Sequence, residues 1–176
     1  LHPDLASIFT TACTDVVSLA SNHTSDWGSE PLLDTMKLFR SMGMQVIGVG
    51  VNAEEARRPA IVEKNGVKVA ILGYCSVLRE GTAAGPNNPG IAPVRAYTTY
   101  QPLYFYPGAP PHVESFPFEH DLAAMKEDIA MAKAQPGKLI LASSAVGSAS
   151  HLTGARFNLI AGIKVVTVAF KGGPDA

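Results

Sequence analysis

The 176-residue chain has few cysteines, few charges and no long hydrophobic run, and each shortage narrows the classes of protein it can belong to. Cys13 and Cys75 are its two cysteines, so we expect neither a disulfide-rich scaffold nor a cysteine-based metal site. Packed free thiols are favoured, with one disulfide as the alternative. No stretch reaches the roughly 18 apolar residues of a transmembrane helix, which predicts no membrane span in this chain.

The charge balance is close to neutral, with 14 Lys and Arg against 15 Asp and Glu, and a net charge of −1. We therefore expect no basic surface, which argues against nucleic acid as a partner. The chain begins Leu1-His2-Pro3, with neither an initiating methionine nor a signal peptide. We interpret it as an internal piece of a longer protein. This leaves the oligomeric state open, and equally the compartment, cell envelope or cytoplasm.

What the sequence does contain is the composition of a globular α/β domain, with a hydrophobic share of 47%. Apolar residues at helical spacing predict helices over 3–12 and 119–135. Strands are expected at 15–20 and 45–49. The helix between them is expected to be capped by Ser29 and to end at Gly43. Strand, helix and strand with short links predict a parallel, right-handed βαβ unit.

Further along, Asn65-Gly66 separates two β-rich runs and predicts a hairpin with positive φ at both turn residues. Residues 79–117 are dense in Gly, Pro and Asn, so we expect a long irregular excursion there. Its aromatic side chains either cover the sheet edge or line a substrate cleft. After Pro136-Gly137, strands at 138–142 and 163–170 flank a short helical pattern and predict a second, C-terminal βαβ piece.

The pattern that bears most directly on function lies at the end of the first predicted strand, where an apolar run gives way to the polar cluster from Ser21 to Asp26. In open α/β sheets, ligands bind at the carboxyl ends of strands. There Asn22 can offer an amide oxygen to a divalent ion and His23 can donate a proton. Asp26 can hydrogen-bond the imidazole and fix its tautomer. The alternative is a hydrogen-bonded turn that only caps the next helix.

A long stretch resembles the bacterial CapA family of capsule and poly-γ-glutamate synthesis proteins. It reads VVSLASNHTSDWGSEPLLDTMKLFRSMGMQVIGVGVNAEEARRPAIVEKNGVKVAILGYCS and covers residues 16–76. The shared features, in order, are a strand, Leu-Ala-x-Asn-His, an Asp three residues later, a Leu-Leu-Asp-Thr helix, an Ala-Arg-Arg-Pro stretch and an Asn-Gly-Val-Lys hairpin. The resemblance runs to about residue 135, which places a truncated CapA-like domain at 1–135.

This resemblance implies part of a metallophosphatase-like layered α/β sandwich with a mostly parallel sheet. It also implies a metal-dependent phosphoesterase-like hydrolase acting on a small-molecule or polymer substrate. Asn22 would be a ligand of a divalent metal, Mn, Zn or Fe, His23 the acid, and Asp26 its orienting partner. The family's N-terminal Gly-Asp segment and its His-Trp-Gly and Gly-x-His-Pro-His motifs are missing here. We therefore expect the chain as given to be incomplete and inactive.

The tail, residues 136–176, resembles a second family, the TctC-like receptors of tripartite tricarboxylate transporters. The shared pattern is Pro-Gly-Lys-Leu, Ala-Ser-Ser, Gly-Ser-x-Ser-His-Leu and a closing Lys-Gly-Gly. Ser148 and Ser150 stand at a predicted helix N-terminus, where free N–H groups favour a carboxylate, although an ordinary helix cap is the alternative. The resemblance implies, as an alternative function, a periplasmic solute-binding module. It also implies a chimaera joined near Gln135.

Overall fold

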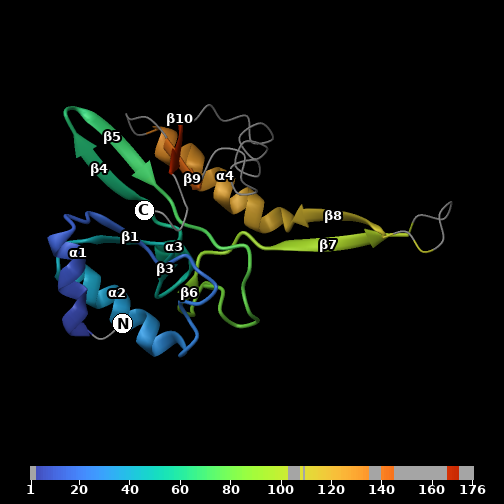
Figure 1. Cartoon of the computed structure of the whole chain (residues 1–176), viewed down its shortest axis with the longest axis horizontal. Helices are drawn as coiled ribbons and strands as arrows, with labels where there is room; N and C mark the ends of the chain where they lie inside the picture. Colours follow the sequence, from blue (N-terminus) through green and yellow to red (C-terminus); the bar gives the residue numbers. More distant parts are fainter. Residues whose placement is uncertain (1–2, 103–107, 109, 135–139, 145–165, 171–176) are drawn as a thin grey trace. The chain divides into compact units, whose positions relative to one another are not determined.

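The computed structural model describes residues 3–102, 108, 110–134, 140–144 and 166–170, and mixes helices with short strands (Figure 1). The chain divides into two compact units. The first consists of Leu1–Arg58 and Leu72–Glu127, and the second of Pro59–Ile71 and Asp128–Ala176. The predicted α/β class is confirmed in its coarse form, a mixed α/β fold, since the described chain contains both helices and strands.

The first unit opens with the predicted N-terminal helix and βαβ unit. A 3-10 turn, Pro3–Ala6, leads into α1 (Ser7–Thr11), and β1 (Val16–Ser18), α2 (Ser29–Ser41) and β2 (Gln45–Ile47) follow. Strands β1 and β2 pair in parallel, as predicted. The apolar face of α2 is buried in the core, where its Phe39 meets the ring of Phe9 edge-on with centroids 5.0 Å apart.

The two ends of α2 differ in how well the sequence predicted them. The residue that caps its N-terminus is Gly28, with a φ of 93°, and Ser29 is already the first helical residue. The expected Ser29 cap is therefore wrong, because the chain enters the helix through a left-handed glycine without a side-chain hydrogen bond. At the other end, the N–H of Gly43 donates to the Arg40 carbonyl at 3.0 Å and its φ is 85°, as a helix-ending glycine requires.

A break at Gly48 splits the predicted strand 45–49. Gly48 has a φ of 82°, so β2 stops before it and a separate strand, β3 (Val49–Gly50), starts after it. β3 pairs antiparallel with β6 (Gly90–Ile91), and Val49 and Ile91 are completely buried there. In the sequence, β3 is followed by α3 (Ala53–Ala56), whose start is capped by the side chain of Asn52.

The region predicted as an irregular excursion contains regular structure instead. Strands β7 (Ala96–Gln101) and β8 (His112–Pro117) form an antiparallel ribbon, and α4 (Glu119–Ala134) follows directly. Helix α4 confirms the helix predicted over 119–135. The ribbon escaped prediction because Gly- and Pro-rich segments before β7 and between the two strands obscured two short β-rich runs.

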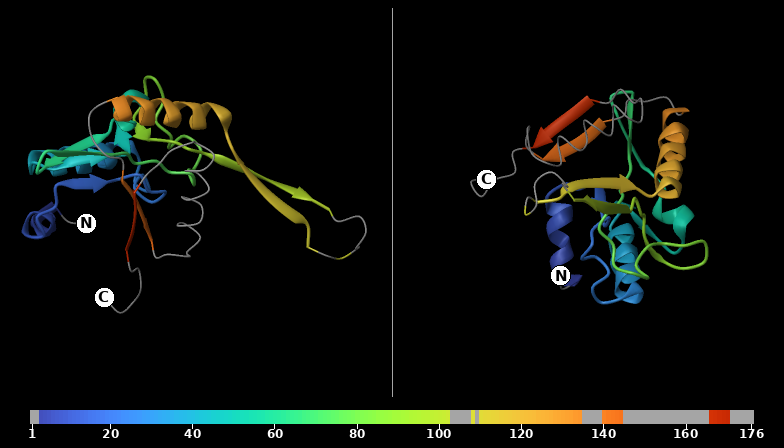
Figure 2. Two further views of the ribbon diagram at one scale, coloured as in Figure 1. Left: turned by 90° about the horizontal axis from the view of Figure 1, so that it is seen from above. Right: turned by 90° about the vertical axis from the view of Figure 1, so that its right-hand side faces the viewer.

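The second unit contains the predicted Asn-Gly hairpin. Strands β4 (Ala60–Lys64) and β5 (Val67–Ile71) pair antiparallel, and the φ values of Asn65 and Gly66 are 54° and 74°. Positive φ at both positions is what a type I′ turn demands, so this prediction is confirmed. The same unit contains β9 (Ile140–Ser144) and β10 (Val166–Phe170), which run side by side in parallel (Figure 2). The helix predicted between them lies outside the described residues.

The described strands form five two-stranded ladders, of which β1–β2 and β9–β10 are parallel and the other three are antiparallel. The expected mostly parallel sheet is therefore not confirmed, because local hairpins supply two of the ladders. The domain boundary predicted between residues 135 and 136 falls outside the described part and stays a prediction. None of the helices in the described ranges has the length and hydrophobicity to cross a bilayer.

Candidate functional site

The end of β1 is held by two glycines that let neighbouring backbones approach it closely. The N–H of Leu19 donates to the Ile47 carbonyl at 3.0 Å, which continues the parallel ladder past β1. A Cβ on Gly48 would lie 2.4 Å from the Cβ of Ala20, and one on Gly73 would lie 3.3 Å from the same atom. A side chain at Gly48 would displace the strand end, whereas one at Gly73 would only crowd it. The glycines thus fix the point from which the polar loop departs.

The polar loop from Ser21 to Gly28 is a run of local turns. The N–H of Thr24 donates to the Ser21 carbonyl at 3.2 Å, and that of Gly28 to the Ser25 carbonyl at 3.0 Å. The side chain of Ser25 is buried, and its hydroxyl has no hydrogen-bond partner among the described residues. Ser25 is therefore the buried point of the loop, while the side chains of His23 and Asp26 near it are exposed.

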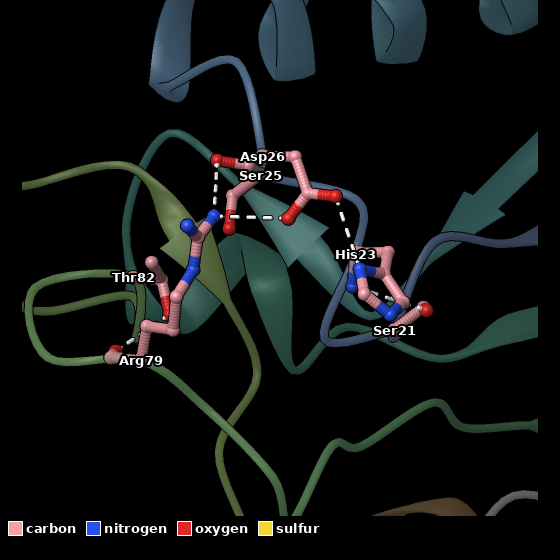
Figure 3. A network of polar contacts seen from close by, with 6 residues as sticks. All are labelled: Ser21, His23, Ser25, Asp26, Arg79 and Thr82. Carbon is pink, nitrogen blue, oxygen red and sulfur yellow. Dashed lines mark hydrogen bonds and ion pairs between the residues drawn. The ribbon is translucent and has the colours of Figure 1, made fainter.

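Within this loop the structure brings His23 and Asp26 together. The Nδ1 of His23 lies 3.0 Å from the Oδ2 of Asp26, and the two side chains are 78% and 40% exposed (Figure 3). Because an ionised carboxylate only accepts hydrogen bonds, Nδ1 is the ring nitrogen that carries the proton in this contact. The other ring nitrogen, Nε2, makes no hydrogen bond to any residue in the described ranges, so it is open to a ligand.

Arg79 completes the cluster, and sequence reasoning missed it. Its Nη2 donates to the Oδ1 of Asp26 at 3.0 Å and to the Ser25 carbonyl at 3.2 Å (Figure 3). Its own carbonyl accepts a hydrogen bond from the Thr82 hydroxyl at 2.8 Å, which closes the turn that carries it. Arg79 is 53 residues from Asp26 in the sequence and stands alone in an irregular loop, so no local pattern marks it.

Each oxygen of the Asp26 carboxylate therefore has its own partner, Oδ2 the imidazole of His23 and Oδ1 the guanidinium of Arg79. These two contacts orient the carboxylate, and through it the ring of His23. None of these side chains caps α2, whose start has no side-chain hydrogen bond. The helix-capping alternative considered for the loop is therefore wrong, whereas the hydrogen-bonded turn is present.

The loop by itself does not make a metal centre. Asn22 is exposed in the same loop, and its amide has no hydrogen bond to the described residues. No group of three or more His, Cys, Asp or Glu side chains in the described part of the chain lies close enough to hold a metal ion. Both oxygens of Asp26 are already engaged, so the amide oxygen of Asn22 is the uncommitted hard donor. One amide oxygen cannot by itself hold a divalent ion such as Mn, Zn or Fe, so further ligands would be needed.

Two serines and two cysteines complete the set of residues that the sequence singled out. Ser148 and Ser150, predicted to capture a carboxylate, lie outside the described residues, so that prediction stays untested. Cys13 and Cys75 are both free thiols. Cys75 is buried as expected, but Cys13 is exposed, and the expectation that both thiols are packed is wrong for that residue.

The chain is similar to one described protein family and to several named bacterial proteins. Residues 1–156 match the family described as bacterial capsule synthesis protein PGA_cap. The chain is 34% identical over 79 residues to the PGA biosynthesis protein CapA of Bacillus subtilis (strain 168). It is 33% identical over 75 residues to the capsule biosynthesis protein CapA of Bacillus anthracis. Over 99 residues it is 31% identical to a probable polyglutamine synthesis accessory protein of Mycobacterium tuberculosis.

These matches cover a large part of the chain but a small part of each relative. They span 44%, 43% and 54% of this chain, and only 21%, 18% and 26% of the respective relatives. The chain thus matches about a quarter or less of the length of these relatives. The family match continues to residue 156, past the predicted join near Gln135. The resemblance of residues 136–176 to tricarboxylate receptors is not supported by these comparisons.

Proposed function

The chain belongs to the PGA_cap family of bacterial capsule synthesis proteins, and we propose that it acts in the synthesis of a capsule or of poly-γ-glutamate. The relatives named CapA support this assignment, because they are named for PGA biosynthesis and for capsule biosynthesis. We propose further that the chain forms part of a metallophosphatase-like layered sandwich. The parallel β1–α2–β2 unit, with a polar loop at the end of β1, is the element of such a fold that the described residues contain.

Within this site we propose that His23 is the group that transfers a proton and that Asp26 positions it. The hydrogen bond from Nδ1 to Asp26 leaves Nε2 as the nitrogen that can give a proton to a leaving oxygen. In the imidazolium both ring nitrogens carry a proton, and Asp26 holds the one on Nδ1, so the one on Nε2 is the proton that can be given. This contact, 3.0 Å long, is the single observation that carries the proposal.

Arg79 has a positioning role in this proposal. It holds the second oxygen of Asp26, so the carboxylate cannot rotate away from the ring without losing an ion pair. It also places a positive charge beside the loop, which suits an anionic substrate such as a phosphoester. In a complete metallophosphatase-like site, Asn22 would supply one amide oxygen to a divalent ion. The remaining ligands would have to come from outside the described residues.

The test measures kcat for the hydrolysis of p-nitrophenyl phosphate in the presence of Mn²⁺. It uses the whole protein in which these residues occur. Removing a general acid costs roughly 10²–10⁴ in rate, so His23→Ala should lose at least about 100-fold in kcat. His112→Ala is the matched control, because it removes another exposed imidazole that faces a carboxylate, that of Glu114 at 3.9 Å. Unchanged turnover in His23→Ala, or an equal loss in both variants, would overturn the assignment.

The alternative function, carboxylate capture at Ser148 and Ser150, has no supporting observation in the described residues. It stays a prediction from the sequence of the tail.

A further inference from the structure

The turn at Asn65-Gly66 is a sequence motif that the proposed function does not use. Both residues are exposed, and they join β4 to β5 at the tip of the hairpin (Figure 1). Asparagine is chemically labile, and most so before glycine, because without a Cβ the next backbone nitrogen reaches the side-chain amide carbon unhindered. The turn therefore holds a reactive pair of groups in contact with water.

The reacting groups of this turn are not engaged elsewhere. Neither the side-chain amide of Asn65 nor the backbone N–H of Gly66 makes a hydrogen bond to any residue in the described ranges. A Cβ built on Gly66 would meet no atom within 4 Å, so the space beside it is open. The strands β4 and β5 pair with no third strand in the described chain, and the tip of such a ladder opens at small cost in free energy. Opening lets the nitrogen rotate toward the amide carbon.

Two other asparagines lack one or more of these conditions and serve as comparators. The side-chain oxygen of Asn52 accepts a hydrogen bond from the N–H of Glu55 at 2.9 Å. The N–H that follows it, that of Ala53, donates to the carbonyl of Gly85 at 2.8 Å, so both reacting groups are held. Asn22 is exposed, but a histidine rather than a glycine follows it. Exposure alone is therefore separable from the effect of the glycine.

We propose that Asn65 is a site of spontaneous deamidation, and that its isoaspartyl product disrupts the β4–β5 hairpin. The nitrogen of Gly66 gives up its proton and bonds to the Cγ of Asn65. The Cγ–Nδ2 bond breaks, and ammonia leaves with that proton. Water then opens the resulting cyclic imide at either carbonyl. One opening gives aspartate, and the other gives isoaspartate, in which the main chain runs through Cβ.

The two products differ in their effect on the hairpin. Asp-Gly suits a type I′ turn as Asn-Gly does, so the aspartyl product keeps the turn. The isoaspartyl product adds a methylene to the main chain between Lys64 and Val67, which lie opposite each other in the ladder. Because turn length sets the register of a hairpin, the longer connection no longer fits this pairing. Either product adds one negative charge to a chain whose net charge is −1.

The experiment stores the folded whole chain at mildly alkaline pH, where the attacking nitrogen loses its proton more readily, and follows each asparagine by mass spectrometry of its peptide. We expect Asn65 to convert at least about tenfold faster than Asn22 or Asn52, which is about 1.4 kcal/mol in activation free energy. Asn65→Gln is the control, because its longer side chain closes the ring slowly, and it should stop the charge change seen by ion exchange. Equal conversion at the three asparagines would overturn the proposal.

A second measurement tests the effect on the hairpin. Hydrogen exchange compares the isoaspartyl product, purified by ion exchange, with Asn65→Asp, which carries the same added charge. We expect the amides of β4 and β5 to lose protection in the isoaspartyl product and to keep it in Asn65→Asp. Equal protection in the two forms, or products that contain no isoaspartate, would also overturn the proposal.

Discussion

The contact between Arg95 and Asp121 gives the most sharply defined stability prediction in the molecule. Asp121 belongs to the first turn of α4, and its side chain is 3% exposed. Its Oδ2 accepts hydrogen bonds from the backbone N–H and from the Nε of Arg95, both at 2.8 Å, and its Oδ1 accepts one from Nη2 at 2.8 Å. Because Arg95 directly precedes β7, this contact fastens the helix to the start of the ribbon.

The pKa of Asp121 is set by two opposing effects, its burial and its pairing with Arg95. Burial by itself would raise this pKa, but the hydrogen bonds from the Arg95 side chain and backbone, together with its positive charge, outweigh burial and hold the pKa below its usual value. A carboxyl group whose pKa is lower in the folded state stabilises the fold above its unfolded-state pKa, near 3.8. That stabilisation is lost as the pH falls through the lower pKa of the folded state.

We therefore expect Asp121→Asn to lower the free energy of unfolding at neutral pH by about 1.5–3 kcal/mol, the usual contribution of a charged hydrogen bond. Arg95 is 39% exposed, which keeps the estimate below the larger loss seen for fully buried pairs. Urea unfolding measures the difference, and Asp34→Asn is the control. Asp34 pairs with Lys37 at 3.2 Å but is 66% exposed, so its loss should stay below about 1 kcal/mol.

Two results would refute this reasoning. Equal losses for Asp121→Asn and Asp34→Asn would mean that burial does not strengthen the pair. A loss for Asp121→Asn that persists undiminished in acid, below the pKa of the folded state, would mean that the ionised carboxylate is not its source.

Two further predictions concern the strand end and the loop. Gly48→Ala should destabilise the chain more than Gly43→Ala in thermal unfolding: both glycines have positive φ, but only the Cβ at Gly48 would meet Ala20, at 2.4 Å. The φ strain alone costs about 1–2 kcal/mol, so a loss at Gly48 no larger than at Gly43 would contradict the close approach. Arg79→Ala should change stability by less than about 1 kcal/mol, because its ion pair with Asp26 is exposed, and yet lower kcat in the hydrolysis assay. Unchanged kcat would remove its positioning role.

The features that the sequence predicted correctly are those set by residues close together in the chain. The hairpin at Asn65-Gly66 follows from two residues that tolerate positive φ, and the β1–α2–β2 unit follows from hydrophobic periodicity and the glycine at 43. The approach of His23 to Asp26 belongs to the same class, since the two lie three residues apart in one loop. Such features need no knowledge of the rest of the fold.

The features that escaped prediction depend on contacts between distant segments. Arg79 reaches Asp26 across 53 residues, and no spacing rule connects a lone arginine to a carboxylate that far away. The N-terminal helix was predicted from the spacing of its apolar residues, but Leu5 and Ile8 are 58% and 64% exposed, so that periodicity gave the helix without giving its buried face. Burial depends on which elements pack together, and periodicity alone does not determine that.

The most direct test of the proposed site is the tautomer of His23, measured by two-bond ¹⁵N–¹H NMR correlations at a pH where the ring is neutral. The account predicts a proton on Nδ1 in the wild type, because Asp26 accepts a hydrogen bond there. It predicts that this preference is lost in Asp26→Asn, because the amide can turn either its acceptor oxygen or its donor NH₂ group toward the ring. A wild-type ring protonated on Nε2, or a tautomer unchanged by Asp26→Asn, would contradict the claim that this dyad presents Nε2 for proton transfer.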